Sequence, residues 1–138
     1  MDIQEFKEQL PSLIEQALVI GRDVFGEECK LTNSIDSIGE LDKVVASLHN
    51  LWKKKLIDDN IAWNTSFLLG TLLGEMIINE QGYHWVIEED LPVVETLRHN
   101  QLSPISKIFK IITDEDSFEG TPSGFYKTFI TLERFADK

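Results

Sequence analysis

The fold is decided by a stretch that reads LLGTLLGEMIINEQGYHWVIEED and runs from Leu68 to Asp90. Together with the residues before it, this stretch predicts a helix from about Ile61 to Glu80 that is apolar around most of its circumference. Its polar side chains fall close to one line, which consists of Asn60, Asn64, Thr71, Glu75 and Asn79. We therefore expect this helix to be the central one, ended by Gly82 in a left-handed cap.

A second line on the same helix consists of small residues four positions apart, Ser66, Gly70 and Gly74. Each interior glycine costs a helix about 1 kcal/mol relative to alanine, so close approach of another backbone is expected to offset that cost. The expected neighbour is a helix of the same chain. A homodimer seam along this line is the alternative.

The residues that follow the central helix alternate in character. One set of positions carries the aromatic and apolar side chains of Tyr83, Trp85 and Ile87. The positions between and after them carry His84, Val86 and Glu88. This period of two predicts a half-buried strand. Residues 92–97 predict a second strand from a weaker signal, and residues 89–91 would be the hairpin loop between the strands. No Asn-Gly or Asp-Gly pair fixes the turn type of this loop. A two-stranded hairpin is marginal alone, so it is expected to pack on the helices.

The N-terminal residues predict an amphipathic helix from Ile3 to about Phe25. Pro11 removes a backbone donor, so we expect either a kink or a short first helix followed by another that starts near the proline. Residues 26–36 have no hydrophobic period and predict a loop.

A further helix precedes the central one. It starts from a capping box formed by Ser37 and Glu40, or from Ser34. One face carries apolar residues at steps of three and four: Ile38, Leu41, Val45, Leu48, Trp52 and Leu56. Residues 58–60 then provide N-cap candidates for the central helix.

Two shorter helices are expected near the C-terminus, because Ser103-Pro104 and Thr121-Pro122 both read as helix starts. The elements together predict an α+β fold, mainly α-helical with a small antiparallel hairpin. Residues 1–138 are expected to form a single globular domain.

The charge of the chain limits its partners. It carries 13 basic and 24 acidic side chains, which gives a formal net charge of −11. Nucleic acids and anionic membranes both require positive potential, so neither is expected as a partner. The one basic run, residues 53–55, is expected to complement the negative end of its helix. A basic protein is the partner that the charge favours.

Other features favour a cytoplasmic protein. Cys29 is the single cysteine, which excludes an internal disulfide and fits a reducing compartment. Its neighbours Glu27 and Glu28 disfavour a catalytic thiolate. The N-terminus carries acids where a signal peptide carries bases. The window 61–78 raises the question of a membrane span, but its polar residues argue against one.

His84 is the candidate for acid–base catalysis. Strand alternation places it opposite Trp85, where Glu75 or Glu88 would orient it as a general acid or base. The favoured interpretation is a partly exposed structural histidine beside a surface glutamate. The apolar neighbours of Glu75 would raise the pKa of a buried carboxyl group, but the polar line described above favours a solvent-facing or rim position.

No cofactor or metal site is predicted. The histidines, at positions 49, 84 and 99, are not spaced with other ligands as a metal motif requires. Residues 114–119 gather carboxylates but lack the alternating ligands and distal glutamate of an EF-hand, so a solvated loop is expected. The sequence contains no phosphate loop, dinucleotide fingerprint or nucleophile elbow, which counts against the common enzyme classes.

Several short motifs follow one another between Trp63 and Phe129. They are LLGTLLGE, Trp85-Val86, Ser103-Pro104-Ile105-Ser106-Lys107, Asp116-Ser117 and Gly124-Phe125-Tyr126. Their order resembles a group of small bacterial proteins of uncharacterised function, which share a Leu-Gly-x-x-Leu-Gly-Glu helix, a tryptophan-bearing strand and a Ser-Pro helix start. The glycine-rich turns of that group are missing between the strands here. The resemblance implies a bacterial, cytoplasmic origin and little about activity.

Three functions follow as hypotheses. The first is an acidic cytoplasmic interaction protein that binds a basic partner through its acidic loops and an exposed tryptophan, for instance an immunity or inhibitor protein. The second is an enzyme that uses His84 with Glu75 or another carboxylate. The third is a structural homodimer through the line of small residues.

Overall fold

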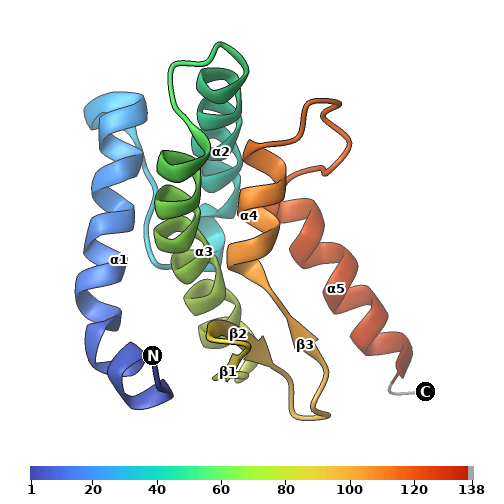
Figure 1. The fold of residues 1–138 in the computed structure, drawn as a ribbon. Coiled ribbons are helices and arrows are strands. Elements are labelled where there is room, and N and C mark those ends of the chain that lie inside the picture. Colours follow the sequence, from blue (N-terminus) through green and yellow to red (C-terminus); the bar gives the residue numbers. More distant parts are fainter. Residues whose placement is uncertain (137–138) are drawn as a thin grey trace.

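Helix α3 occupies the centre of the computed structural model, which describes residues 1–136 (Figure 1). Helix α3 spans Asp59–Gln81, close to the predicted limits. The side chain of Asp58 accepts a hydrogen bond from the backbone N–H of Ile61 at 2.8 Å, so it is the N-cap. Gly82 ends the helix in the left-handed conformation, with φ 75° and ψ 24°, as predicted.

The remaining elements surround α3. They are α1 (Ile3–Phe25), the 3₁₀ turns η1 (Gly26–Glu28) and η2 (Ile35–Ser37), α2 (Ile38–Lys53), β1 (His84–Glu88), β2 (Leu91–Glu95), β3 (Gln101–Leu102), α4 (Pro104–Ile112) and α5 (Pro122–Ala136). Figure 1 shows α1 and α4 on opposite sides of α3, with the small sheet at one end and α5 on the outside beyond α4. The predicted fold class, mainly helical α+β with a small antiparallel sheet, is confirmed.

The line of small residues on α3 faces other parts of the same chain. A Cβ added at Gly70 would stand 2.7 Å from the backbone nitrogen of Ile105, in the first turn of α4. One added at Gly74 would stand 2.5 Å from Cζ2 of Trp85 in β1. Ser66 is buried and donates its hydroxyl to the carbonyl of Ala62. The line is therefore an intrachain contact, as expected, and α4 and β1 cover the surface that a dimer seam would need.

The sheet has one strand more than predicted. The order is β1-β2-β3, with β1 antiparallel to β2 and Glu88 opposite Leu91. The turn between them is Glu89-Asp90, with φ of 50° and 64°, as a type I′ hairpin turn requires. The third strand, β3, has only two residues, which is too short to show a period in the sequence.

Helix α1 corrects one expectation. It continues through Pro11 without ending, so the alternative of two separate helices is wrong. The carbonyl that loses its donor to the proline belongs to Lys7, an exposed residue.

Helix α2 begins and ends differently from the prediction. The hydroxyl of Ser37 makes no cap bond, because its oxygen accepts a hydrogen bond from the backbone N–H of Thr32 at 3.0 Å and its hydrogen faces the carbonyls of Thr32 and Ser34. The predicted capping box is therefore wrong, and the side chain of Ser34 instead caps the 3₁₀ turn η2. The helix also ends at Lys53, which leaves Leu56 in the following turn with 66% of its surface exposed.

The two C-terminal helices begin at the predicted prolines. Ser103 precedes α4 without a side-chain cap bond. Thr121 caps α5 by accepting a hydrogen bond from the N–H of Gly124 at 3.0 Å. A second cap comes from α2, where Asp42 accepts hydrogen bonds from the backbone N–H and the hydroxyl of Ser123, at 2.9 and 2.5 Å.

By length and composition, α3 is the one helix within residues 1–136 that would be able to cross a membrane. In this fold 61% of the residues in its most apolar window are buried inside the protein.

Candidate functional site

The candidate site lies at the end of the molecule where α2 turns into α3. The chain leaves α2 through a tight turn, in which Lys55 has φ 60° and Leu56 N–H bonds back to the carbonyl of Leu51. The turn brings Trp52, in the last turn of α2, against Asp59, the first residue of α3. The indole N–H of Trp52 donates a hydrogen bond to the carboxylate of Asp59 at 2.8 Å.

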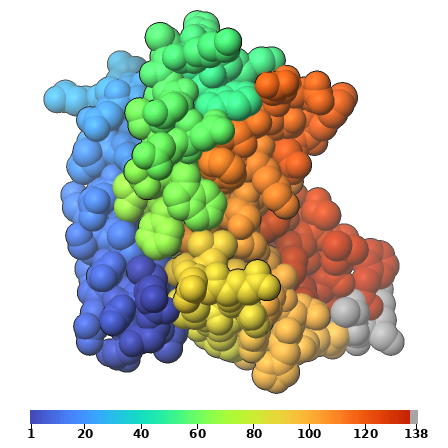
Figure 2. Space-filling model, viewed as in Figure 1, coloured from blue at the N-terminus to red at the C-terminus, as the bar shows by residue number. Residues whose placement is uncertain are grey.

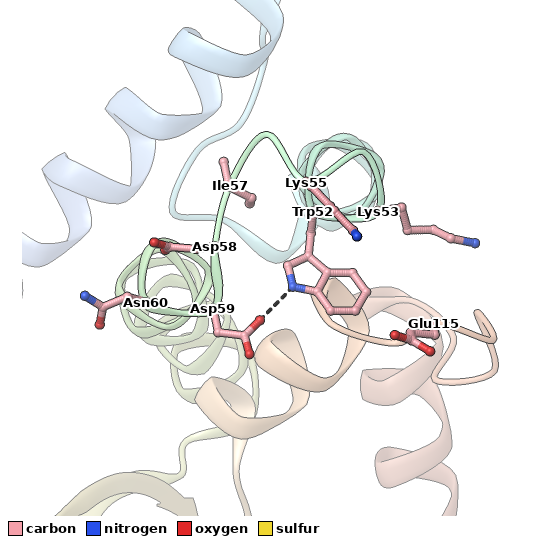
Figure 3. A pocket seen from close by; sticks show the side chains of 8 residues that line it. All are labelled: Trp52, Lys53, Lys55, Ile57, Asp58, Asp59, Asn60 and Glu115. Carbon is pink, nitrogen blue, oxygen red and sulfur yellow. Dashed lines mark hydrogen bonds between the residues drawn. The ribbon is translucent and has the colours of Figure 1, made fainter.

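A hollow of about 850 Å³ opens beside this pair (Figure 3). Its walls carry the Trp52 indole, three carboxylates and two lysines, with Ile57 and Asn60 completing the lining: Trp52, Lys53, Lys55, Ile57, Asp58, Asp59, Asn60 and Glu115. Figure 3 shows Asp59 and Glu115 on either side of the indole. A hollow of this size is typical of ligand-binding sites.

The far wall is the loop between α4 and α5, and Asp114 holds its shape. One carboxylate oxygen of Asp114 accepts from the backbone N–H of Glu119 at 2.8 Å, and the other accepts from that of Asp116 at 3.2 Å. The bond from Glu119 is the main reason that the pKa of Asp114 lies below its usual value. The loop therefore presents Glu115 in a defined position.

His49 connects the indole to this loop. Its ring stacks beside that of Trp52, with centroids 6.5 Å apart and an interplanar angle of 23°. The Nδ1 atom donates to the carbonyl of Ile112 at 3.0 Å, so in the neutral ring Nε2 accepts from the hydroxyl of Ser117 at 3.1 Å. The histidine thus has a positioning role beneath the hollow.

Three exposed apolar side chains lie in the segments that line the hollow, two of them next in sequence to lining residues and one in the loop that carries Glu115. Leu56 is 66% exposed, Ile61 is 48% exposed and Phe118, in the α4–α5 loop, is 89% exposed. We call the hollow together with these three side chains and Asp116 the end surface. Figure 2 shows the α2–α3 turn, in green, next to the α4–α5 loop, in orange, at this end of the molecule.

The end surface carries an excess of negative charge. Residues 53–60 and 114–119 contain three lysines and six carboxylates. Asp58 and Asp114 bind backbone N–H groups, and Lys107 pairs with Glu119 at 2.8 Å. Among the ion pairs within residues 1–136, none includes Glu115, Asp116 or the lysines of the hollow. Unpaired carboxylates next to apolar groups are a combination that suits a cationic partner.

The residues predicted for catalysis lie elsewhere, Glu75 on α3 and His84 on β1, and have other partners. Glu75 is partly buried and accepts a hydrogen bond from the indole N–H of Trp85 at 2.8 Å, in agreement with a rim position. His84 points to the other face of the sheet, where its Nε2 lies 3.4 Å from Glu95. Glu95 also binds His99 at 2.9 Å.

These contacts change the chemical context of His84. The bond from His99, followed by one from Gln101, keeps the pKa of the Glu95 carboxyl group below its usual value. The carboxylate beside His84 is therefore Glu95, whereas Glu75 accepts the hydrogen bond from the indole of Trp85. Neither His84 nor Glu75 lines the hollow at the end surface. The catalytic role of His84 stays a prediction.

Other chemistry is sparse. Residues 1–136 contain no group of three or more histidine, cysteine, aspartate or glutamate side chains arranged to hold a metal ion. Cys29 is a free thiol, half-buried beside Gly21. A second hollow, of about 470 Å³, lies along α5 and is mostly apolar, with Phe125, Phe129 and Leu132 on its wall.

The hollow at the end surface was not predicted as a unit. Sequence patterns assigned Trp52 to a core-facing stripe and residues 58–60 to a helix cap, and they assigned residues 114–119 to a solvated loop. The available signal was a tryptophan in the last turn of one helix, followed within seven residues by the acidic N-cap of the next. The pairing of that turn with the acidic loop is a tertiary contact that no local pattern contains.

In comparisons with known proteins, the chain matches no protein-family model, no curated protein and no solved structure.

Proposed function

We propose that the protein is a small acidic interaction module of the cytoplasm that binds a basic partner protein through the end surface. An immunity or inhibitor protein directed at a basic toxin or enzyme would be one instance of this function. The observation that carries the proposal is the meeting of an open, tryptophan-lined hollow with unpaired carboxylates and exposed apolar side chains.

The chemistry of the end surface supports this function. Interface centres are enriched in aromatic residues, and carboxylates around them steer and orient a cationic partner. The net charge of −11 adds long-range attraction for the same class of partner. The exposed apolar groups Leu56, Ile61 and Phe118 would lose water on binding, which contributes to affinity.

Nuclear magnetic resonance can locate the binding face with hexa-lysine as the probe. We expect the largest amide shift changes at residues 52–61 and 113–119, because both the hollow and the unpaired carboxylates lie there. The double variant Glu115→Lys/Asp116→Lys should bind the peptide about tenfold more weakly, since it reverses two charges at the surface.

The matched control is Glu8→Lys/Glu80→Lys, which changes the net charge equally at exposed positions on α1 and on the other end of α3. It should reduce affinity by about twofold or less, because distant charges are screened by salt. Shift changes centred on the hairpin tip, residues 88–90, or an equal loss of affinity in both double variants, would overturn the proposal.

A further inference from the structure

We infer that the hollow recognises an arginine side chain of the basic partner and holds its guanidinium group against the indole of Trp52. This inference rests on the proposed function and names the group that the end surface selects. Three properties of the hollow carry it: the fixed orientation of the indole, the carboxylates on both sides of it, and the open space above it.

The indole is already held in place before a ligand arrives. The bond from its N–H to Asp59 sets the direction of the ring edge. His49 stacks beside the ring, lies outside the lining of the hollow and is itself bonded to the loop. The Trp52 indole itself lines the hollow. A preorganised ring loses little conformational entropy on binding, which favours affinity.

The carboxylates complement a cation lying on that ring. Asp59 uses one oxygen, Oδ1, for the indole N–H, which leaves Oδ2 available. Glu115 approaches from the α4–α5 loop and makes no ion pair within the described part of the chain. A cation between them would gain an attraction to the aromatic face and charge-assisted hydrogen bonds at its edges.

The shape of the site favours arginine over lysine. A guanidinium group is planar, stacks on aromatic faces and presents several donors in one plane, whereas an ammonium group is compact and strongly hydrated. The hollow, at about 850 Å³, also has room for the backbone that carries the side chain. An arginine on an exposed loop or helix of the partner fits this space.

Two lysines line the hollow, and their positions lead to a prediction that is specific to this site. Figure 3 shows the ammonium group of Lys53 directed away from the indole, while Lys55 lies closer to it. Lys55 would repel an arginine in the hollow. Lys55→Ala should therefore tighten binding about twofold, whereas Lys53→Ala should change it less.

The experiment uses acetyl-Gly-Arg-Gly-amide as the probe and follows the indole N–H signals of the full chain by nuclear magnetic resonance. The three tryptophans give three signals, and Trp52→Phe identifies the one from the hollow. We expect the peptide to shift this signal. The citrulline peptide, which has the same shape without the charge, should bind about tenfold more weakly, and the lysine peptide about threefold more weakly.

The variants separate the ring from the charge. Trp52→Leu should weaken binding of the arginine peptide about tenfold, and Trp52→Phe about threefold, because phenylalanine keeps an aromatic face. Glu115→Gln should cost about threefold, and it cannot disturb the fold through a lost contact, since the side chain makes no hydrogen bond or ion pair within residues 1–136.

The outcomes distinguish the inference from the proposed function. If hexa-lysine still maps to the end surface while Trp52→Leu and Glu115→Gln bind the arginine peptide as tightly as the native chain, the arginine site is refuted and the interaction surface stands. If arginine and citrulline peptides bind equally, the inference is refuted as well. If hexa-lysine maps elsewhere, both proposals fail.

Discussion

Gly74 of α3 lies directly against the indole ring of Trp85, so that a Cβ at this position would stand 2.5 Å from Cζ2 of the ring. The ring has little freedom to move away. It packs edge to face on Phe6, with centroids 4.9 Å apart, and its N–H is bonded to Glu75. The glycine is therefore a requirement of the contact between α3 and β1, and its cost to the helix is offset by this packing.

We predict that Gly74→Ala lowers the free energy of unfolding by about 2 kcal/mol, because the overlap with Trp85 outweighs the gain in helix propensity. Urea unfolding measures the change, and near-ultraviolet circular dichroism reports whether the indole has moved. The matched control is Gly39→Ala in the first turn of α2, where an added Cβ meets nothing within 4 Å. An equally stable Gly74→Ala protein would show that the two elements are not in close contact.

Gly70→Ala should cost about 3 kcal/mol, which is more than the change at Gly74. The two nearest atoms that a Cβ would meet at Gly70 belong to the backbone of Ile105, which cannot rotate to a new position as a side chain can. Differential scanning calorimetry would measure the loss as a lower melting temperature. A smaller loss than that of Gly74→Ala would mean that α4 shifts easily along α3.

The bond between Trp85 and Glu75 supports a further prediction. Glu75→Leu should lower the free energy of unfolding by about 2 kcal/mol, because it leaves the buried indole N–H without an acceptor. Glu75→Gln keeps an acceptor and should cost less than about 1 kcal/mol. Glu80→Leu, at an exposed position of the same helix, is the control for the change in charge. Equal losses in all three variants would contradict a role for the bond.

Much of this architecture follows from local patterns in the sequence. The limits of α3 were predictable because Asp58 and Gly82 satisfy backbone groups within their own turns. Ser37 was misread because its hydroxyl oxygen had a competing donor five residues earlier, the backbone N–H of Thr32. At Pro11 only the alternative of two separate helices was wrong, because an exposed helix face tolerates the loss of one hydrogen bond. These errors arise where solvent or a nearby loop provides an alternative partner.

The candidate site was less accessible to the same reasoning. Trp52 and Asp59 are seven residues apart and their bond depends on the turn between two helices. Glu115 reaches them only because α4 returns along α3 and ends beside that turn. In the same way, Glu75 or Glu88 was predicted to orient His84 from closeness in sequence, whereas strand pairing places Glu95 opposite His84. Contacts between elements require the register and the packing, which a single sequence does not show.

The cap of α5 by Asp42 tests how firmly the last helix is attached. Asp42→Ala removes the acceptor of both bonds to Ser123 and should lower the free energy of unfolding by about 2 kcal/mol. Hydrogen exchange should become faster at the start of α5 before it changes elsewhere. The control is Asp23→Ala, which removes the same charge from an exposed position on α1. Unchanged exchange in α5 would show that other contacts anchor the helix.

The loop that carries Glu115 should lose stability in acid because Asp114 holds it. The N–H of Glu119 lowers the pKa of Asp114 in the folded protein below its ordinary value of 3.8. A lowered folded-state pKa stabilises the protein fully above the unfolded-state pKa, and this stabilisation disappears as the pH falls through the folded-state value. Asp114→Asn should therefore be less stable than the native chain near about pH 7, and the difference should shrink below about pH 4.

Urea unfolding across this range measures the difference, and Asp116→Asn, whose side chain makes no hydrogen bond within residues 1–136, is the matched control. A difference between native and Asp114→Asn proteins that stays constant down to about pH 2 would mean that the carboxylate charge does not hold the loop.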